Sequence, residues 1–383
     1  MKVALVQLDA NGDCLYATTI ARQIKQDYPG CHLTWWISSR CRGLLVGNPH
    51  VDEVVAVDLK DWTNTSRGLA WALAKAEILR RQTGPDPYDR VWMPQIYPDN
   101  FRHFDGTVRP SQFRGYDRPI TVPIDPVIHL TEEERSNVAR YAAEHRLADR
   151  ERVVLFECSS NSSQSHVTPE FAKEVAALAN QQGLKATFLL STMIPLGADL
   201  PPNAFSAGKL SMRENLALLD HCSHFVGCGS GLTVIATCDQ AKNIPNLQIL
   251  DRSKSVLASF FHDFCYWNKN ADRFIEMPDA SPALAVECLK REFEKGHDAA
   301  VSDFHKPCGV SFEFVHEITV YLIGRGQYLD AAECVAHTFR RYPERLELRK
   351  FARRNILPLC TFDKSCQLPG GRTQWQFVQQ VFT

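Results

Sequence analysis

The sequence alternates short apolar runs with amphipathic runs, and this alternation restarts after about residue 150. Apolar runs bounded by polar turns predict buried parallel strands, and amphipathic runs predict the helices that cover them. The expected strands are Val3–Leu8, Leu33–Ser38, Val51–Val57, Arg90–Pro94, Ile120–Ile124, Val153–Glu157, Ala186–Leu190, Phe225–Val226 and Leu247–Leu250. The expected helices are Leu15–Gln26, Leu69–Gln82, Thr131–Leu147, Pro169–Gln182, Arg213–Cys222 and Thr233–Cys238. The pattern therefore predicts an α/β fold with two Rossmann-like, doubly wound domains.

A chain of 383 residues is longer than one ordinary core supports, so we expect several parts. They are an N-terminal domain (1–130), a connecting helix (131–150), a second domain (151–297) and a helical extension (298–383). The extension contains a helical hairpin with tetratricopeptide-like spacing. Because one hairpin cannot stack into a solenoid, we expect it to pack on the second domain or on a partner. Two domains of this kind would enclose a cleft in which ligands bind.

Composition excludes several classes of protein. The net charge is −1 and the sequence pI is about 6.9, so there is no general electrostatic footprint for nucleic acid. No apolar stretch is long enough to span a bilayer, and Met1-Lys2 leads directly into a strand without the pattern of a secretory signal. The 13 cysteines are scattered with no C-x-x-C pair, which favours free thiols in a reducing cytoplasm.

The turn after the first strand carries Asp9, Asn11, Gly12 and Asp13. Gly12 would permit a tight turn and close approach of a ligand. Asp13 directly precedes the expected helix, and spacing alone favours a helix cap for it. A carboxylate at the carboxyl end of a strand would also face the expected cleft. Both interpretations of Asp13 remain open at this point.

Two turns of the second domain have features of anion-binding sites. In the first, Ser159, Ser160 and His166 lie between a strand and a helix that begins at Thr168-Pro169; hydroxyls and backbone N–H groups there suit a phosphate, and a polar linker is an equal alternative. The second is FVGCGSGLTVIA, in which glycines alternate before a helix. The predicted nest for an anion there consists of Ser230, Gly231, Leu232 and Thr233.

A longer stretch carries a resemblance to a known family. GDCLYATTIARQIKQDYPGCHLTWWISSRCRGLLVGNPHVDEVV, residues 12–55, resembles the start of the bacterial heptosyltransferase-type glycosyltransferases, with the helix, the Tyr-Pro and the Asn-Pro-His-Val-Asp-Glu-Val segment in order. FVGCGSGLTVIA resembles the donor-binding segment of that family. SSNSSQSHVTPEFAKEVAALA resembles its phosphate loop and the helix that follows. The resemblance covers residues 1 to about 250.

The resemblance implies a GT-B fold and transfer of a sugar, a heptose or a related one, from a nucleoside diphosphate with inversion. Asp13 matches the proposed general base of the family. Ser159, Ser160, His166 and residues 230–233 would bind the donor, for which the resemblance suggests an ADP-linked sugar. No Asp-x-Asp motif occurs, so no metal is expected at the leaving group. The acceptor would be a lipopolysaccharide or another surface glycan, reached by a cytoplasmic protein through peripheral association with the membrane.

The loop between residues 100 and 119 would contribute to the acceptor site. With Gly12, its basic residues Arg102 and Arg109, together with His103 and Arg114, would meet an anionic acceptor, although charges on loops are often only solvated.

The chain also departs from the family pattern. His166 replaces a usual lysine, and Gly229 and Val234 replace a usual aspartate and histidine of the donor motif. Alternatives are therefore a glycosyltransferase that acts on a protein, and a non-catalytic binding protein of the same fold. A sugar-nucleotide epimerase would need an acid–base cluster that no part of the sequence suggests.

Overall fold

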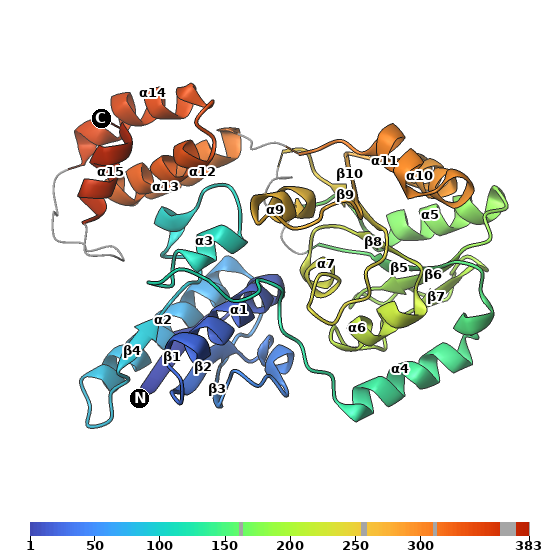
Figure 1. The fold of residues 1–383 in the computed structure, drawn as a ribbon, viewed down its shortest axis with the longest axis horizontal. Coiled ribbons are helices and arrows are strands. Elements are labelled where there is room, and N and C mark those ends of the chain that lie inside the picture. Colours follow the sequence, from blue (N-terminus) through green and yellow to red (C-terminus); the bar gives the residue numbers. More distant parts are fainter. Residues whose placement is uncertain (161–163, 254–258, 309–311, 361–372, 383) are drawn as a thin grey trace. The chain divides into compact units, whose positions relative to one another are not determined.

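The computed structural model describes residues 1–160, 164–253, 259–308, 312–360 and 373–382, and it divides into two compact units (Figure 1). Unit 1 consists of Met1–Ile124 and Ser311–Thr383, and unit 2 is Asp125–Val310. The observed division differs from the predicted one in two places. The expected connecting helix is part of unit 2, and the C-terminal helices are part of unit 1.

Unit 1 contains a parallel four-stranded sheet in the order β3-β2-β1-β4. Its strands are β1 (Lys2–Val6), β2 (His32–Ser38), β3 (Glu53–Val57) and β4 (Arg90–Trp92). Its first helices are α1 (Asn11–Asp27), α2 (Asn64–Gln82) and α3 (Arg109–Phe113), with short 3-10 turns η1 (Arg42–Leu45) and η2 (Phe101–His103). Because the chain moves outward from β1 to β3 and then crosses back to β4, right-handed connections place α1 and α2 on opposite faces of the sheet.

Alternation along the strands builds the core of this sheet. Ala4 and Val6 of β1 lie in one buried cluster with Trp71, Ala74 and Ile78 of α2. The intervening residues of β1 point to the opposite face, as the pleat requires.

One predicted strand of unit 1 is wrong. Residues 120–124 form no ladder, and the backbone N–H groups of Thr121 and Val122 instead donate to Oε1 of Gln23 on α1, at 2.7 and 3.0 Å. The side-chain amide of Gln23 therefore accepts backbone N–H groups that the predicted strand would have paired with a neighbouring strand.

The C-terminal helices are α12 (Phe312–Gly324), α13 (Tyr328–Arg341), α14 (Leu346–Asn355), the 3-10 turn η5 (Leu357–Leu359) and α15 (Gln374–Phe382). The predicted hairpin is confirmed as α12 and α13, but it packs within unit 1 and not on the second domain. Phe101 meets Tyr321 with ring centroids 5.6 Å apart, and Phe104 meets Phe314 at 5.8 Å. These aromatic pairs join the loop after β4 to α12.

A buried carboxylate also joins the C-terminal helices to that loop. Asp105 is fully buried and pairs with Arg114 at 2.6 Å and with Arg341 of α13 at 3.4 Å. Burial alone would raise the pKa of Asp105, but the two guanidinium groups hold it below its usual range. Removing one partner of such a buried pair costs about 3–5 kcal/mol. The charged cluster therefore anchors the helical hairpin to unit 1.

Unit 2 is a parallel six-stranded sheet in the order β10-β9-β8-β5-β6-β7. Its strands are β5 (Val153–Glu157), β6 (Thr187–Ser191), β7 (Ala204–Ser206), β8 (His224–Gly227), β9 (Asn246–Leu250) and β10 (Phe274–Pro278). Its helical elements are α4 (Glu132–Glu144), η3 (Leu147–Asp149), α5 (Pro169–Gln181), α6 (Glu214–Leu218), η4 (Leu219–His221), α7 (Gly231–Ile235), α9 (Phe260–Tyr266), α10 (Pro282–Lys295) and α11 (His297–Phe304). Helices α5, α10 and α11 cover one face of this sheet in a single buried cluster.

Helix α4 begins with a capping box, in which Thr131 and Glu134 are bonded to each other's backbone N–H groups. Within the described ranges, no helix has both the length and the apolar character needed to cross a membrane. None of the twelve cysteines that the structure describes forms a disulfide.

Candidate active site

Both sheets reverse their strand order beside the first strand of the unit. In unit 1 the switch lies between β1 and β4, and in unit 2 it lies between β5 and β8. Ligands of open α/β sheets bind at the carboxyl ends of strands at such switch points. Asp13 follows β1 and the glycine-rich turn follows β8, so the main predicted site residues lie at these two positions.

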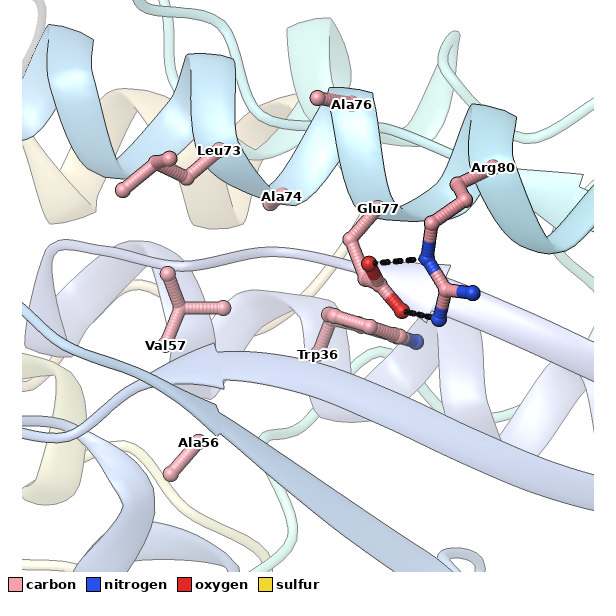
Figure 2. A pocket seen from close by; sticks show the side chains of 8 residues that line it. All are labelled: Trp36, Ala56, Val57, Leu73, Ala74, Ala76, Glu77 and Arg80. Atoms are coloured by element: carbon pink, nitrogen blue, oxygen red, sulfur yellow. Dashed lines mark hydrogen bonds and ion pairs between the residues drawn. The ribbon is translucent and has the colours of Figure 1, made fainter.

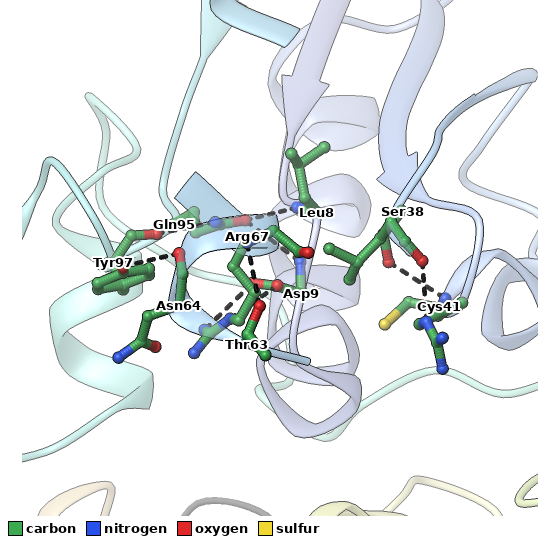
Figure 3. Close-up of polar contacts among 12 residues, drawn as sticks. Leu8, Asp9, Ser38, Cys41, Thr63, Asn64, Arg67, Gln95 and Tyr97 are labelled. Atoms are coloured by element: carbon green, nitrogen blue, oxygen red, sulfur yellow. Dashed lines mark hydrogen bonds and ion pairs between the residues drawn. The ribbon is translucent and has the colours of Figure 1, made fainter. Parts of the chain in front are cut away.

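The turn after β1 is held by Asp9 (Figure 3). Asp9 is 2% exposed, and its carboxylate accepts hydrogen bonds from Nε and Nη2 of Arg67, on α2, at 2.9 and 3.3 Å. Oε1 of Gln95, after β4, accepts the backbone N–H groups of Leu8 and Asp9 at 2.6 and 3.2 Å. Arg67 also lies 4.8 Å from the ring of Tyr97. Asp9 is therefore a structural residue of the switch point.

Asp13 is not a cap. Helix α1 begins earlier than predicted, with Ala10 at the N-cap, so Asp13 lies inside the first turn. A carboxylate there is stabilised by the positive end of the helix dipole. Gln112, buried on α3, donates its Nε2 to Oδ1 of Asp13 at 3.0 Å. The partly buried carboxylate is thus held in place from a second helix.

The electrostatic setting of Asp13 differs from that of an ordinary surface aspartate. Burial raises its pKa from 3.8 to about 6, and Asp9 adds to the increase while Arg67 opposes it. The carboxyl group of Asp13 therefore holds its proton more tightly than an ordinary aspartate does.

The residues predicted to bind an acceptor are placed differently. Gly12 lies beside Asp13 in the first turn of α1. Arg109 is only 1% exposed; it donates to the carbonyl of Ile124 at 3.2 Å and covers the ring of Tyr16 at 4.5 Å. Its predicted place on a solvated loop is therefore wrong, because α3 packs it against α1. Arg102 is half-buried on η2, where its charge acts on Glu333 of α13.

The predicted anion nest in unit 2 is filled by a carboxylate of the chain itself. Glu157, at the end of β5, is 3% exposed. One of its oxygens accepts the N–H groups of Leu232 and Thr233 at 2.8 and 3.2 Å, and the other accepts N–H of Cys228 at 2.9 Å and the hydroxyl of Thr233 at 2.6 Å. The interpretation of Leu232 and Thr233 as phosphate donors must be corrected, since Glu157 already takes their donors.

The remaining predicted donor residues keep more freedom. Ser230 is partly exposed at the N-cap of α7, next to Gly231, and its backbone N–H lies 3.4 Å from Glu157. Ser159 and Ser160 are partly exposed, and Ser160 donates to Gln164 at 2.6 Å. Residues 161–163 of the same loop lie outside the described residues.

His166 makes contacts that the sequence did not predict. Its Nε2 is 2.9 Å from the carbonyl of Ala280, and its ring meets that of Phe171 edge-on. These contacts connect the loop to the segment after β10, and His166 is exposed.

A largely apolar pocket between α2 and the strands β2 and β3 contains none of these residues (Figure 2). The paired Glu77 and Arg80 close one end of it. Its lining residues are Trp36, Ala56, Val57, Leu73, Ala74, Ala76, Glu77 and Arg80.

Glu157→Gln should lower the free energy of unfolding of unit 2 by about 3 kcal/mol, because an amide turns an N–H₂ group toward backbone donors that a carboxylate accepts. Urea denaturation measured by circular dichroism checks this value. Glu174→Gln, on the exposed side of α5, is the matched control and should leave the midpoint unchanged. An unchanged midpoint for Glu157→Gln would contradict the role given to this carboxylate.

Known proteins that are similar to this chain are found by structure and not by sequence. The sequence matches no protein-family model and no curated protein. Among solved structures, the chain is similar to a glycosyltransferase of family 9 from Veillonella parvula, with 15% identity, a TM-score of 0.50, and coverage of 85% of this chain and 97% of that one. It is also similar to the ADP-heptose lipopolysaccharide heptosyltransferase II of E. coli, with 16% identity, a TM-score of 0.50, and coverage of 76% and 98%. The resemblance inferred from the sequence is thus confirmed for the fold: this chain has the GT-B fold of the heptosyltransferase-type glycosyltransferases.

Proposed function

We propose that this protein is an inverting glycosyltransferase that moves a sugar from a nucleoside diphosphate to an acceptor hydroxyl, with Asp13 as general base. The observation that carries the proposal is the setting of Asp13 at the switch point of unit 1, with a pKa near 6 and a fixed orientation. The GT-B fold is the second support. The proposed donor carries a heptose or a related sugar, and ADP is the first nucleotide proposed to carry it.

In the proposed reaction, Asp13 accepts the proton of the acceptor hydroxyl while its oxygen bonds to the anomeric carbon. The bond from that carbon to the diphosphate breaks on the opposite face, which inverts the configuration. Gln112 holds one carboxylate oxygen of Asp13, and the proposal assigns the proton to the other oxygen. General base catalysis of this kind contributes about 10²–10⁴-fold to the rate.

Unit 2 is the proposed donor-binding unit. Because Glu157 occupies the backbone donors of the nest, the groups proposed to meet the diphosphate are the hydroxyls of Ser159, Ser160 and Ser230 and the ring of His166. No metal is proposed for this step. The proposed acceptor is a surface glycan such as a lipopolysaccharide or, alternatively, a protein, and the proposed location is the cytoplasm, with peripheral association with the membrane.

A second candidate function is a non-catalytic binding protein with the same fold. The observation that favours it is Glu157, a buried negative charge at the switch point of unit 2. A carboxylate at this point repels the diphosphate of a donor, since like charges placed together disfavour binding.

Calorimetric titration with ADP, UDP, GDP, CMP and dTDP separates the two candidates. We expect one nucleotide to bind, and Ser230→Asp to weaken it at least about tenfold by like-charge repulsion. Ser302→Asp, exposed on α11, is the matched control and should bind as the wild type does. Binding of none of the five would favour the non-catalytic candidate.

Asp13→Asn should reduce transfer by about 10²–10⁴-fold, because an amide cannot accept the proton, and should leave nucleotide affinity unchanged. Release of the nucleoside diphosphate from the donor that binds measures transfer. Asp58→Asn, exposed after β3, is the control. Wild-type turnover in Asp13→Asn would refute the assignment of the base.

Asp13 should also make stability depend on pH. Its folded pKa is raised, so the folded state holds the proton more tightly than the unfolded chain, and the stability from this group is lost as the pH rises through about 6. Asp13→Asn should therefore melt at a higher temperature than the wild type above pH 7. The two melting temperatures should converge below about pH 4. A variant that is less stable than the wild type at every pH would contradict the raised pKa.

A further inference from the structure

Unit 1 contains a second cluster of titratable side chains, away from Asp13. His103, the last residue of η2, faces Glu333 and His337, which lie one turn apart on α13. One ligand atom from each of the three residues can be chosen so that all lie within 4.8 Å of one another. His103 and Glu333 are 6% and 1% exposed, so water has little access to them.

The separations suit a metal ion. Nδ1 of His103 is 3.8 Å from Oε1 of Glu333, and Nε2 of His337 is 3.4 Å from the same oxygen. Ligands at about 2.0–2.1 Å from a tetrahedral zinc ion are separated by roughly 3.4 Å. Two positions four residues apart on one helix face the same way, which is the spacing that helical metal sites use.

The chemistry of the donor atoms points in the same direction. Nδ1 of His103 and Oε2 of Glu333 are buried and have no hydrogen-bond partner. A cation would satisfy both groups.

Charges around the cluster nearly balance. Arg102 and Arg114 oppose a cation, and Asp105 already pairs with Arg114 and Arg341. On the other side, Asp330 adds negative charge. Gln374 of α15 holds Asp330 at 2.7 Å, and Phe377 covers His337 with ring centroids 4.6 Å apart.

A similar triad in unit 2 shows what a satisfied cluster looks like. Glu292 lies 3.0 Å from Nδ1 of His297 and 3.5 Å from Nε2 of His224. The outer nitrogens are also occupied, by the carbonyl of Asp272 and the hydroxyl of Ser223. Although burial opposes it, the two histidines lower the pKa of Glu292 to about 2. Two histidines and a glutamate thus form a complete hydrogen-bond network in unit 2. In the cluster of unit 1, one buried nitrogen and one buried carboxylate oxygen have no hydrogen-bond partner.

The geometry points to a binding site for a divalent transition metal, of which Zn²⁺ is the probe, formed by His103, Glu333 and His337. Two nitrogen ligands and one carboxylate favour such an ion over Mg²⁺ or Ca²⁺, which prefer oxygen. The ion would clamp α13 to the loop after β4 and so fix the C-terminal helices to unit 1. It takes no part in the proposed sugar transfer.

The test uses the full chain after removal of any histidine tag. Metal analysis after dialysis with Zn²⁺ should find about one zinc per chain, and Co²⁺ in its place should give visible absorption that excess chelator removes. Zinc should raise the melting temperature and slow hydrogen exchange in α13. Absence of stoichiometric zinc, or of any thermal shift, would overturn the site.

Variants locate the ion. Loss of an outer-sphere partner weakens metal binding by about 10–100-fold. Glu333→Gln and His337→Gln each remove a proposed direct ligand, so each should weaken zinc binding by more than this. His297→Gln, from the satisfied triad, is the matched control and should bind zinc as the wild type does. Circular dichroism checks that each variant is folded. If a variant does not fold, the Co²⁺ spectrum of the wild type still tests the site. Undiminished binding in both ligand variants would place the ion elsewhere and refute the proposal.

Discussion

The ion pair between Asp9 and Arg67 is the constraint on which the candidate site of unit 1 depends. It closes the turn after β1 against α2, and it places one positive and one negative charge behind Asp13. Because the carboxylate of Asp9 is engaged, α1 can begin with a second carboxylate in its first turn that remains partly exposed. One aspartate thus builds the turn, and the other is left available for chemistry.

The two units solve the same topological problem with different groups. Each sheet has a switch point where backbone N–H groups and side chains converge. In unit 1 the amide of Gln95 accepts the backbone donors. In unit 2 the carboxylate of Glu157 does so, and it can approach because Gly227 has no side chain where Thr233 and Gln248 crowd the turn. The turn of unit 1 is therefore closed by a neutral amide, and the turn of unit 2 is closed by a buried carboxylate.

Much of the fold could be predicted from the sequence because strands and helices follow local periodicity. The start of α1 could not, since Asp-Ala-Asn-Gly has the composition of a turn and is helical only from Asn11. The partners of the two aspartates could not be predicted either. Arg67 is 58 residues from Asp9, and Gln112 is 99 residues from Asp13. Glu157 looked like one more strand residue, because its role depends on a turn 71 to 76 residues later. Contacts between residues so far apart do not affect the local periodicity of the sequence.

The order of the two units along the chain has a consequence for synthesis. Unit 2 lies within the sequence of unit 1, so the ribosome completes unit 2 first, although unit 1 begins earlier. Until α12 and α13 emerge, Phe101 and Phe104 of the loop after β4 lack their aromatic partners on α12, and Asp105 has only Arg114 of its two guanidinium partners. Exposed apolar surface of this kind promotes aggregation of folding intermediates. The nascent chain is thus expected to need protection at this loop until α12 and α13 have been synthesised.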